Sequence, residues 1–252
     1  INPKKMGTKA SFYIDAEIEA GESNIFDFRL SPHEMDNAFY DFDEVFSLRK
    51  SEADEFYHDI QNDVKTEDEK NIQRQAFAGL LWNKQFYHYT VSKWLNGDPK
   101  HEVQRDFSHY VRNTEWKHMQ NKDIISMPDK WEYPWFATWD LAFHCVPFAL
   151  IDPGFAKHQL RLLTKEWYMH PNGQLPAYEW DFSDVNPPVH AWATFRVFKI
   201  DEKINGAPDL SFLESVFQKL LLNFTWCVNR KDKKGNNVFG GGFLGLDNIG
   251  AF

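Results

Sequence analysis

The segment "DKWEYPWFATWDLAFH", residues 129–144, places the strongest constraint on how this chain can fold. It crowds aromatic side chains around Asp140 and contains no glycine. Exposed rings would form a sticky apolar patch. A plain core would use more Leu, Ile and Val, and would exclude Asp140 unless a partner satisfied its carboxylate. The segment therefore indicates either a ring-lined binding cleft or a core with a well-paired Asp140. The rings are Trp131, Tyr133, Trp135, Phe136, Trp139 and Phe143.

This mixture of side chains suits a flat ligand that carries many hydroxyl groups. Aromatic rings cover the apolar face of such a ligand, while carboxylates and indole N–H groups bind its polar edge. The whole chain has the same character, since aromatic residues make up 17% of it and Trp occurs 10 times. A protein with a large aromatic-lined cleft is the interpretation that this composition favours.

Charge and cysteine content exclude several other classes of protein. The net charge is −9 and no block of Lys and Arg stands out, so a nucleic-acid partner is not expected. No run of 18 apolar residues and no signal peptide occurs, which argues against a membrane protein and favours a cytoplasmic location. Cys145 and Cys227 lie in apolar helical contexts without metal-ligand spacing, so we expect buried thiols, no metal and no other cofactor.

The pattern of apolar residues changes from strand-like to helical along the chain. Residues 8–30 alternate around Gly21 and predict a β-hairpin or two paired strands. Helical periodicity then predicts helices over 43–60 and 67–95, followed by an irregular stretch over 97–130. We expect residues 1–35 to end an N-terminal β domain, 36–130 to hold a linker and the first helices of a helical domain, and 131–252 to form a further, incomplete part of that helical domain.

Further helices are predicted in the second half of the chain. They cover about 136–150, Pro153 to about Tyr168, a stretch ending near Ile200, and about 209–229. Helix pairs joined by short turns on one side and long aromatic loops on the other predict a mainly α fold, a partial α/α toroid preceded by a short strand segment. The first residue is not Met and the last segment is apolar, so we expect part of a longer protein. We therefore also expect an exposed apolar helix face, which a second copy of the chain could cover in a homo-oligomer.

Three segments combine aromatic residues, Pro or Gly, and hydrogen-bonding groups. They are residues 131–144, 174–192 and 239–250. In a toroid of helix pairs, the loops at one end converge on a single funnel. Cleavage of a glycosidic bond there needs two carboxyl groups, one to protonate the leaving oxygen and one to activate water or attack.

These segments resemble three successive motifs of glycoside hydrolase family 63, which contains processing α-glucosidase-like enzymes. The motifs are "SMPDKWEYPWFATWDLAFH", "GQLPAYEWDFSDVNPPVHAWA" and "GGFLGLDNIG", and they occur in the family's order within residues 120–252. The resemblance implies an (α/α)6 barrel, often preceded by a β-sandwich domain. It also implies an inverting, exo-acting hydrolase of α-linked sugars, so the expected partner is a carbohydrate substrate.

The resemblance also implies roles for individual residues. Asp140, the aspartate of the Trp-Asp pair, would bind hydroxyls of the terminal sugar beside Trp139. Tyr133 would line the same subsite, and Asn186 before the Pro-Pro pair takes the place of a polar residue that contacts the sugar. Trp192 opens a predicted helix that would face the funnel, so we include it among the substrate-binding residues.

The general acid in this family is the aspartate of a Glu-Ser-Gly-x-Asp-Asn pattern, which corresponds to Asp247 here. Gly245, Asp247 and Asn248 match the pattern, but Phe243 and Leu244 replace its Glu and Ser. The family's general base is a glutamate far downstream, and we do not expect it among these residues.

Two other interpretations remain open. Asp140 could pair inside a helical core, and Asp247 could shape a Gly-rich turn. A catalytically inactive carbohydrate-binding or scaffold protein of the same fold would explain the replacements at Phe243 and Leu244. An α/α-toroid lyase fits less well, because it usually needs a basic cleft, and none is evident in the sequence.

Overall fold

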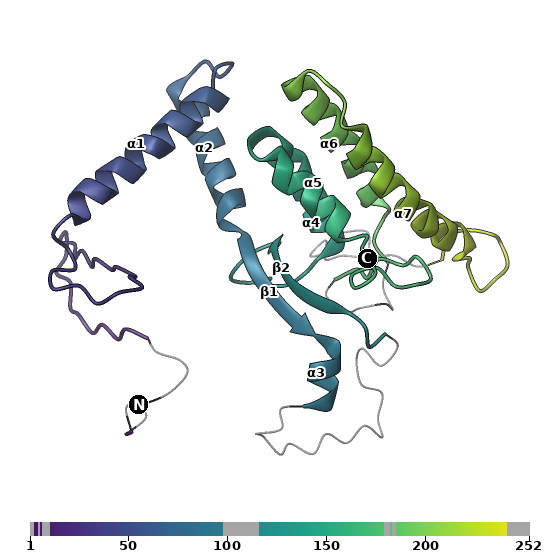
Figure 1. Cartoon of the computed structure of the whole chain (residues 1–252), viewed down its shortest axis with the longest axis horizontal. Helices are drawn as coiled ribbons and strands as arrows, with labels where there is room; N and C mark the ends of the chain where they lie inside the picture. Colours follow the sequence, from purple (N-terminus) through teal and green to yellow (C-terminus); the bar gives the residue numbers. More distant parts are fainter. Residues whose placement is uncertain are drawn as a thin grey trace. The chain divides into compact units, whose positions relative to one another are not determined.

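The computed structural model describes residues 3–4, 6, 11–97, 116–178, 182 and 185–240 of the chain. Its contacts divide the chain into two compact units, Ile1–Phe56 and Tyr57–Phe252. Helices dominate the described residues, and a two-stranded antiparallel sheet accompanies them (Figure 1). The prediction of a mainly α fold is confirmed. The arrangement is compatible with a partial toroid, but the toroid itself stays a prediction. The domain limits at residues 35 and 130 also stay predictions.

The first unit contains the segment predicted to form paired strands, but no strand is assigned to residues 11–30. The chain does turn at Gly21, where φ is +87°, and the rings of Phe12 and Phe28 lie 5.2 Å apart. The prediction of a strand ladder is therefore wrong for these residues. An isolated two-stranded ribbon is marginal in water, and here the segment is almost entirely exposed to solvent, so no packing supports a ladder.

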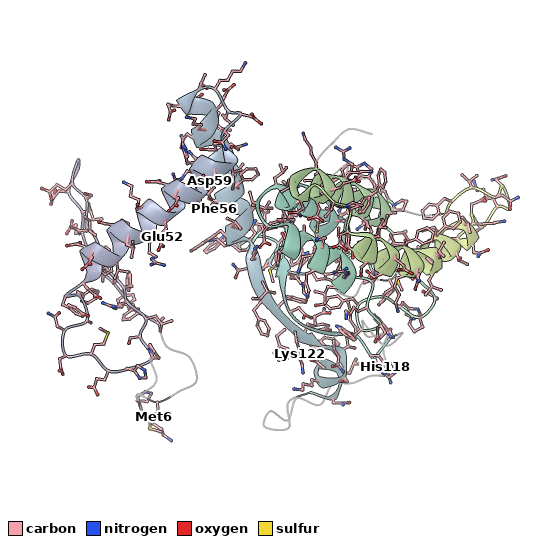
Figure 2. The ribbon with its side chains drawn as sticks, turned by 45° about the horizontal axis from the view of Figure 1, so that its top comes forward. Met6, Glu52, Phe56, Asp59, His118 and Lys122 are labelled. Atoms are coloured by element: carbon pink, nitrogen blue, oxygen red, sulfur yellow. The ribbon has the colours of Figure 1, made fainter. Side chains whose placement is uncertain are left out.

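The next two helices were both expected from the periodicity. α1 (Phe42–Ile60) begins in the first unit and ends in the second. α2 (Glu67–Trp82) begins with a capping box in which Thr66 and Glu69 each bind the other's backbone N–H group. Figure 2 labels Glu52, Phe56 and Asp59 along α1.

The predicted helix over 67–95 is interrupted by a strand. After α2, β1 (Lys84–Thr90) and α3 (Val91–Asn96) follow, and β1 pairs antiparallel with β2 (Gln120–Ser126). The stretch 97–130, predicted to be irregular, thus contains a strand. Its residues 98–115 lie outside the described part. Side chains alternate across a strand, and Ile125 of β2 is completely buried while its neighbour Ile124 is exposed.

Four helices form the body of the second unit (Figure 1). α4 (Thr138–Ile151) packs against α5 (Pro153–Leu162) and α6 (Val189–Asn205), and α6 packs against α7 (Leu210–Asn229). Asp152 caps α5, because its carboxylate accepts the Phe155 N–H at 2.9 Å. α5 ends six residues earlier than expected, at Leu162 rather than near Tyr168.

The core lies where α4, α5 and α6 meet, and α7 covers it only partly. Leu141, Phe148 and Val197 are completely buried there. Phe195 on α6 and Phe224 on α7 are instead exposed, and they line an apolar groove between these two helices. The open apolar helix face expected from the sequence is therefore present.

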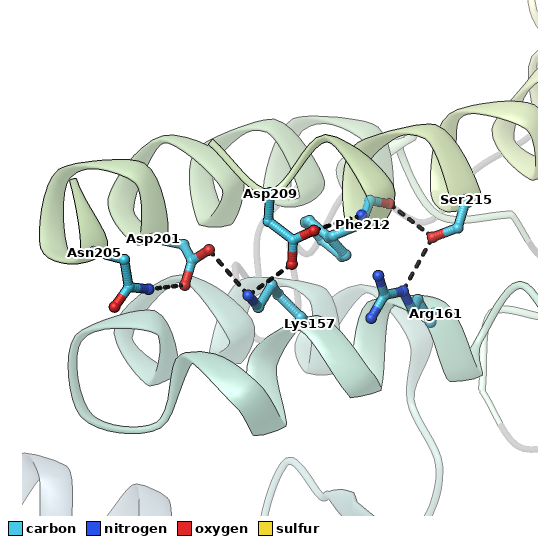
Figure 3. Close-up of polar contacts among 7 residues, drawn as sticks. All are labelled: Lys157, Arg161, Asp201, Asn205, Asp209, Phe212 and Ser215. Atoms are coloured by element: carbon cyan, nitrogen blue, oxygen red, sulfur yellow. Dashed lines mark hydrogen bonds and ion pairs between the residues drawn. The ribbon is translucent and has the colours of Figure 1, made fainter. Parts of the chain in front are cut away.

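Lys157 on α5 forms two ion pairs, one to α6 and one to the start of α7 (Figure 3). Its Nζ lies 3.0 Å from Oδ2 of Asp201 on α6 and 2.9 Å from Oδ2 of Asp209, the N-cap of α7. The side chain of Asp201 is only 2% exposed. Burial lowers the pKa of Lys157, but its hydrogen bonds to both carboxylates outweigh this and leave the pKa raised. A buried carboxylate needs such a partner, so Lys157 fixes α6 and α7 against α5.

Removing this charge tests how much of the packing depends on it. Lys157→Met keeps most of the aliphatic stem but leaves Asp201 buried without its cation, so the free energy of unfolding should fall by about 3–5 kcal/mol. Lys199→Met is the matched control, because Lys199 is half-exposed and pairs with Glu202 within one turn. It should cost less than about 1 kcal/mol in the same denaturant titration. Equal effects of the two variants would contradict this role of Lys157.

Candidate functional site

The first two sequence motifs meet at the beginning of α4. Ala137 forms an isolated antiparallel bridge with Tyr178, and the Thr138 N–H donates to the carbonyl oxygen of Ala177 at 3.0 Å. The Thr138 hydroxyl also donates to the carbonyl of Pro176. Segments 131–144 and 174–192 were predicted to converge, and these contacts bring them together. Of the third segment, only residues 239 and 240 are described, and Asp247 lies outside the described residues, so its convergence stays a prediction.

Asn186 adds a side chain to the same junction. Its amide donates to the Ala177 carbonyl oxygen at 3.0 Å, so this oxygen accepts from both Asn186 and Thr138. One carbonyl has two lone pairs and can accept both bonds. Pro187 and Pro188 follow Asn186 and cannot donate backbone hydrogen bonds, so the Asn186 side chain and the Val189 N–H, which donates to the Pro187 carbonyl oxygen at 2.7 Å, hold this turn before α6.

Trp139 and Asn186 line one pocket, but the pocket is small. Its volume is about 30 Å³, whereas pockets for small organic ligands have about 300–1,000 Å³. The pocket has room for water but not for a sugar ring. The described residues therefore bring two predicted sugar-binding residues together without forming a complete sugar site.

Asp140 occupies the third position of α4, where the helix dipole favours a negative charge. It is half-buried. Burial raises the pKa of Asp140, while hydrogen bonds from its own backbone N–H and from the Trp139 indole oppose the shift without cancelling it. A carboxylate in this position can accept hydrogen bonds from ligand hydroxyls when it is ionised.

Several of the predicted aromatic residues lie partly exposed around this helix end, whereas Phe136 is completely buried. The rings of Trp139 and Phe143 are 6.0 Å apart, and Phe143 lies 5.6 Å from Trp192 on α6. Trp192 is 48% exposed, so it is available to a ligand. Tyr133 is 46% exposed and packs edge-on against Trp135, with ring centres 5.3 Å apart.

Sequence reasoning missed the residues that hold this junction. Thr138 and Ala177 carry no distinctive side-chain signal, and their contact depends on backbone groups 39 residues apart. His190, near the start of α6, is 3% exposed, and its Nε2 lies 2.9 Å from the Leu160 carbonyl oxygen. Burial lowers the pKa of His190 to about 4, so its ring is neutral at neutral pH.

A wider pocket of about 440 Å³ lies beside β2 and is lined by none of the predicted site residues. His118 and Lys122, labelled in Figure 2, contribute to it together with Asp123 and Trp167. Among the described residues, no cluster of three His, Cys, Asp or Glu side chains could hold a metal ion. No helix in this part of the chain is long and apolar enough to cross a membrane.

Comparisons with known proteins bear on the same region. Residues 133–240 match the model of the mannosylglycerate hydrolase MGH1-like glycoside hydrolase domain. This range holds α4 to α7, the second motif and the part of the first motif from Tyr133 onward, and it ends before Asp247. The resemblance to a glycoside hydrolase domain is therefore confirmed for this part of the chain.

A much longer protein aligns with the whole chain. It is the uncharacterized protein YMR196W of Saccharomyces cerevisiae, which is 54% identical over 267 aligned residues. The alignment covers 100% of this chain and 24% of the yeast protein, so the chain spans about a quarter of the length of this curated relative. No solved structure matches the chain.

Asp140→Asn tests whether this carboxylate is structural. The folded-state pKa of Asp140 is raised, so its ionised form weakens folding above that pKa. Asn removes the buried charge and keeps an acceptor for Trp139, so the free energy of unfolding at pH 7 should be unchanged or higher. Asp201→Asn is the matched control and should lower it by roughly 1.5–3 kcal/mol, because Asp201 pairs with Lys157. A comparable loss at Asp140 would identify it as a structural, paired group.

Proposed function

We propose that this chain forms part of an inverting, exo-acting glycoside hydrolase that acts on α-linked glucosides or related oligosaccharides. The observation that carries the proposal is the match of residues 133–240 to a glycoside hydrolase domain. The junction at Ala177 supports it, because it assembles Trp139 and Asn186 from two motifs that the resemblance assigns to sugar binding.

In this proposal, the described residues hold the terminal sugar. Asp140 accepts hydrogen bonds from sugar hydroxyls, and the amide oxygen of Asn186 accepts another. The rings of Tyr133, Trp139 and Trp192 cover the apolar faces of the substrate, as aromatic side chains commonly do for sugars and other flat ligands. No metal or cofactor takes part.

Proton transfer is assigned to Asp247 and to a glutamate outside these residues. Asp247 protonates the leaving oxygen, and the glutamate activates water on the opposite face of the sugar ring. A general acid must remain protonated near neutral pH, which apolar surroundings favour. Phe243, Leu244 and Leu246 flank Asp247 in sequence and supply such side chains.

A second candidate function rests on the same flanking residues. Phe243 and Leu244 stand where the resemblance leads us to expect Glu and Ser. This departure favours a carbohydrate-binding protein of the same fold that has lost catalysis. Such a protein would bind sugars through Asp140 and would show no hydrolysis, so activity separates the two candidates.

Substrate affinity tests the role of Asp140. In the complete polypeptide, Asp140→Asn should weaken sugar binding by roughly 10- to 100-fold, the value of a charge-assisted hydrogen bond of about 1.5–3 kcal/mol. Calorimetric titration with glucose, mannose and a glycosylglycerate measures this, since the matched domain is named for mannosylglycerate hydrolases. Unchanged affinity for every sugar that the unsubstituted protein binds would remove Asp140 from the site.

Asp247→Asn in the complete polypeptide tests the general acid. The variant should lose hydrolysis of natural glycosides at least about 100-fold, the lower range of general acid–base contributions. It should keep much more activity on a glycosyl fluoride, whose leaving group needs no proton. Asp232→Asn is the control, because Asp232 accepts backbone hydrogen bonds in the turn after α7. Equal loss on both substrates, or no loss on either, would place the acid elsewhere.

A further inference from the structure

His190 presents a buried hydrogen-bond acceptor that the proposed mechanism does not use. It is the second residue of α6, and its Nε2 lies 2.9 Å from the carbonyl oxygen of Leu160. A carbonyl only accepts, so Nε2 must carry the hydrogen in this bond. In the neutral ring, Nδ1 then has a lone pair and no hydrogen. It is buried, and within the described part of the chain it has no hydrogen-bond partner.

The pocket that His190 lines has the size and the polarity of a site for one water molecule. Its volume of about 30 Å³ exceeds the roughly 10–15 Å³ that a water needs. Thr138, Trp139, Asn186 and Asn223 line the same pocket. An unpaired buried acceptor costs about 1–3 kcal/mol, and a donor that fits this pocket removes the cost.

Three side-chain donors of the pocket already bind neighbouring carbonyl oxygens. The Thr138 hydroxyl donates to Pro176, the Asn186 amide to Ala177 at 3.0 Å, and the Asn223 amide to Gly173 at 2.8 Å. An amide nitrogen has two hydrogens. Asn186 and Asn223 can therefore each keep the bond described and offer a second N–H to a molecule in the pocket.

We infer that an ordered water molecule occupies this pocket, donates to Nδ1 of His190 and accepts from the amides of Asn186 and Asn223. His190 is thereby a positioning residue: through the water it ties α6 and α7 to the turn that presents Asn186 beside Trp139. The water site stands on geometry alone, whereas its effect on substrate rests on the proposed function.

A crystal structure of the complete polypeptide that resolves ordered solvent tests the site without any assay. A water oxygen within about 3.2 Å of Nδ1 is expected in the absence of sugar. A dry pocket, or a protein group on Nδ1, would overturn the inference. Density that appears only in crystals soaked with glucose would overturn it too, because the donor would then be a substrate hydroxyl.

A larger side chain in the pocket should change the midpoint of thermal unfolding in opposite directions, depending on whether the pocket holds a water molecule or is dry. Val185 is buried and lines the pocket, so Val185→Ile adds one methylene group to it. If the water is displaced from Nδ1, the midpoint of thermal unfolding should fall by at least about 2–4 °C. A higher midpoint would mean that the pocket is a dry cavity, and it would contradict the inference.

Two substitutions of His190 separate the two ring nitrogens. His190→Asn places an oxygen near Nδ1 and loses the bond to Leu160, whereas His190→Gln keeps a donor near Nε2 and loses the acceptor. On a glycoside that the complete polypeptide hydrolyses, Gln should raise KM about 10-fold with less change in kcat, the effect of one lost buried hydrogen bond, and Asn should raise KM less. The reverse order would assign His190 to the Leu160 bond alone. If no glycoside is hydrolysed but the water is seen, the proposed function fails and the water site stands.

Discussion

One carbonyl oxygen holds the candidate site together. The Ala177 oxygen accepts hydrogen bonds from the Thr138 backbone and from the Asn186 side chain, each at 3.0 Å. The first bond sets where α4 begins, which fixes Trp139 and Asp140 in its first turn. The second holds the turn that leads into α6. Because the junction is buried, a lost bond would leave an unsatisfied polar group, which costs about 1–3 kcal/mol.

The helices around this junction keep it in place. Asn223 on α7 donates to the Gly173 carbonyl, and a Cβ at Gly173 would lie 2.3 Å from the Leu222 carbonyl oxygen. Only glycine permits this close approach, and glycine also adopts the φ of +92° found here without steric cost. Lys157 on α5 also fixes α6 and α7, through its ion pairs with Asp201 and Asp209. The second motif is thus held at its first residue, Gly173, by α7, and at its end, which forms the first turn of α6.

Local sequence signals predicted the helices well and the long-range contacts poorly. Asp152 before Pro153 marks the start of α5, because capping depends on neighbouring residues. β1 was predicted as helix, since its pairing with β2 depends on residues about 36 positions away, such as Tyr87 and Asp123. Of the three segments predicted to converge, the first two do meet, and the convergence of the third stays a prediction. The contact of Ala177 with Thr138 and the burial of His190 could not be predicted, because each depends on a partner that is distant in sequence.

The anomer first released from an α-glycoside tests the central claim most directly. The complete polypeptide is incubated with α-glucosides, α-mannosides and glycosylglycerates, and the products are followed by proton NMR before mutarotation. An inverting hydrolase releases the β-anomer first, which is the result that the account predicts. Initial release of the α-anomer would contradict the inverting mechanism. No hydrolysis of any glycoside, together with sugar binding that depends on Asp140, would favour the binding protein instead.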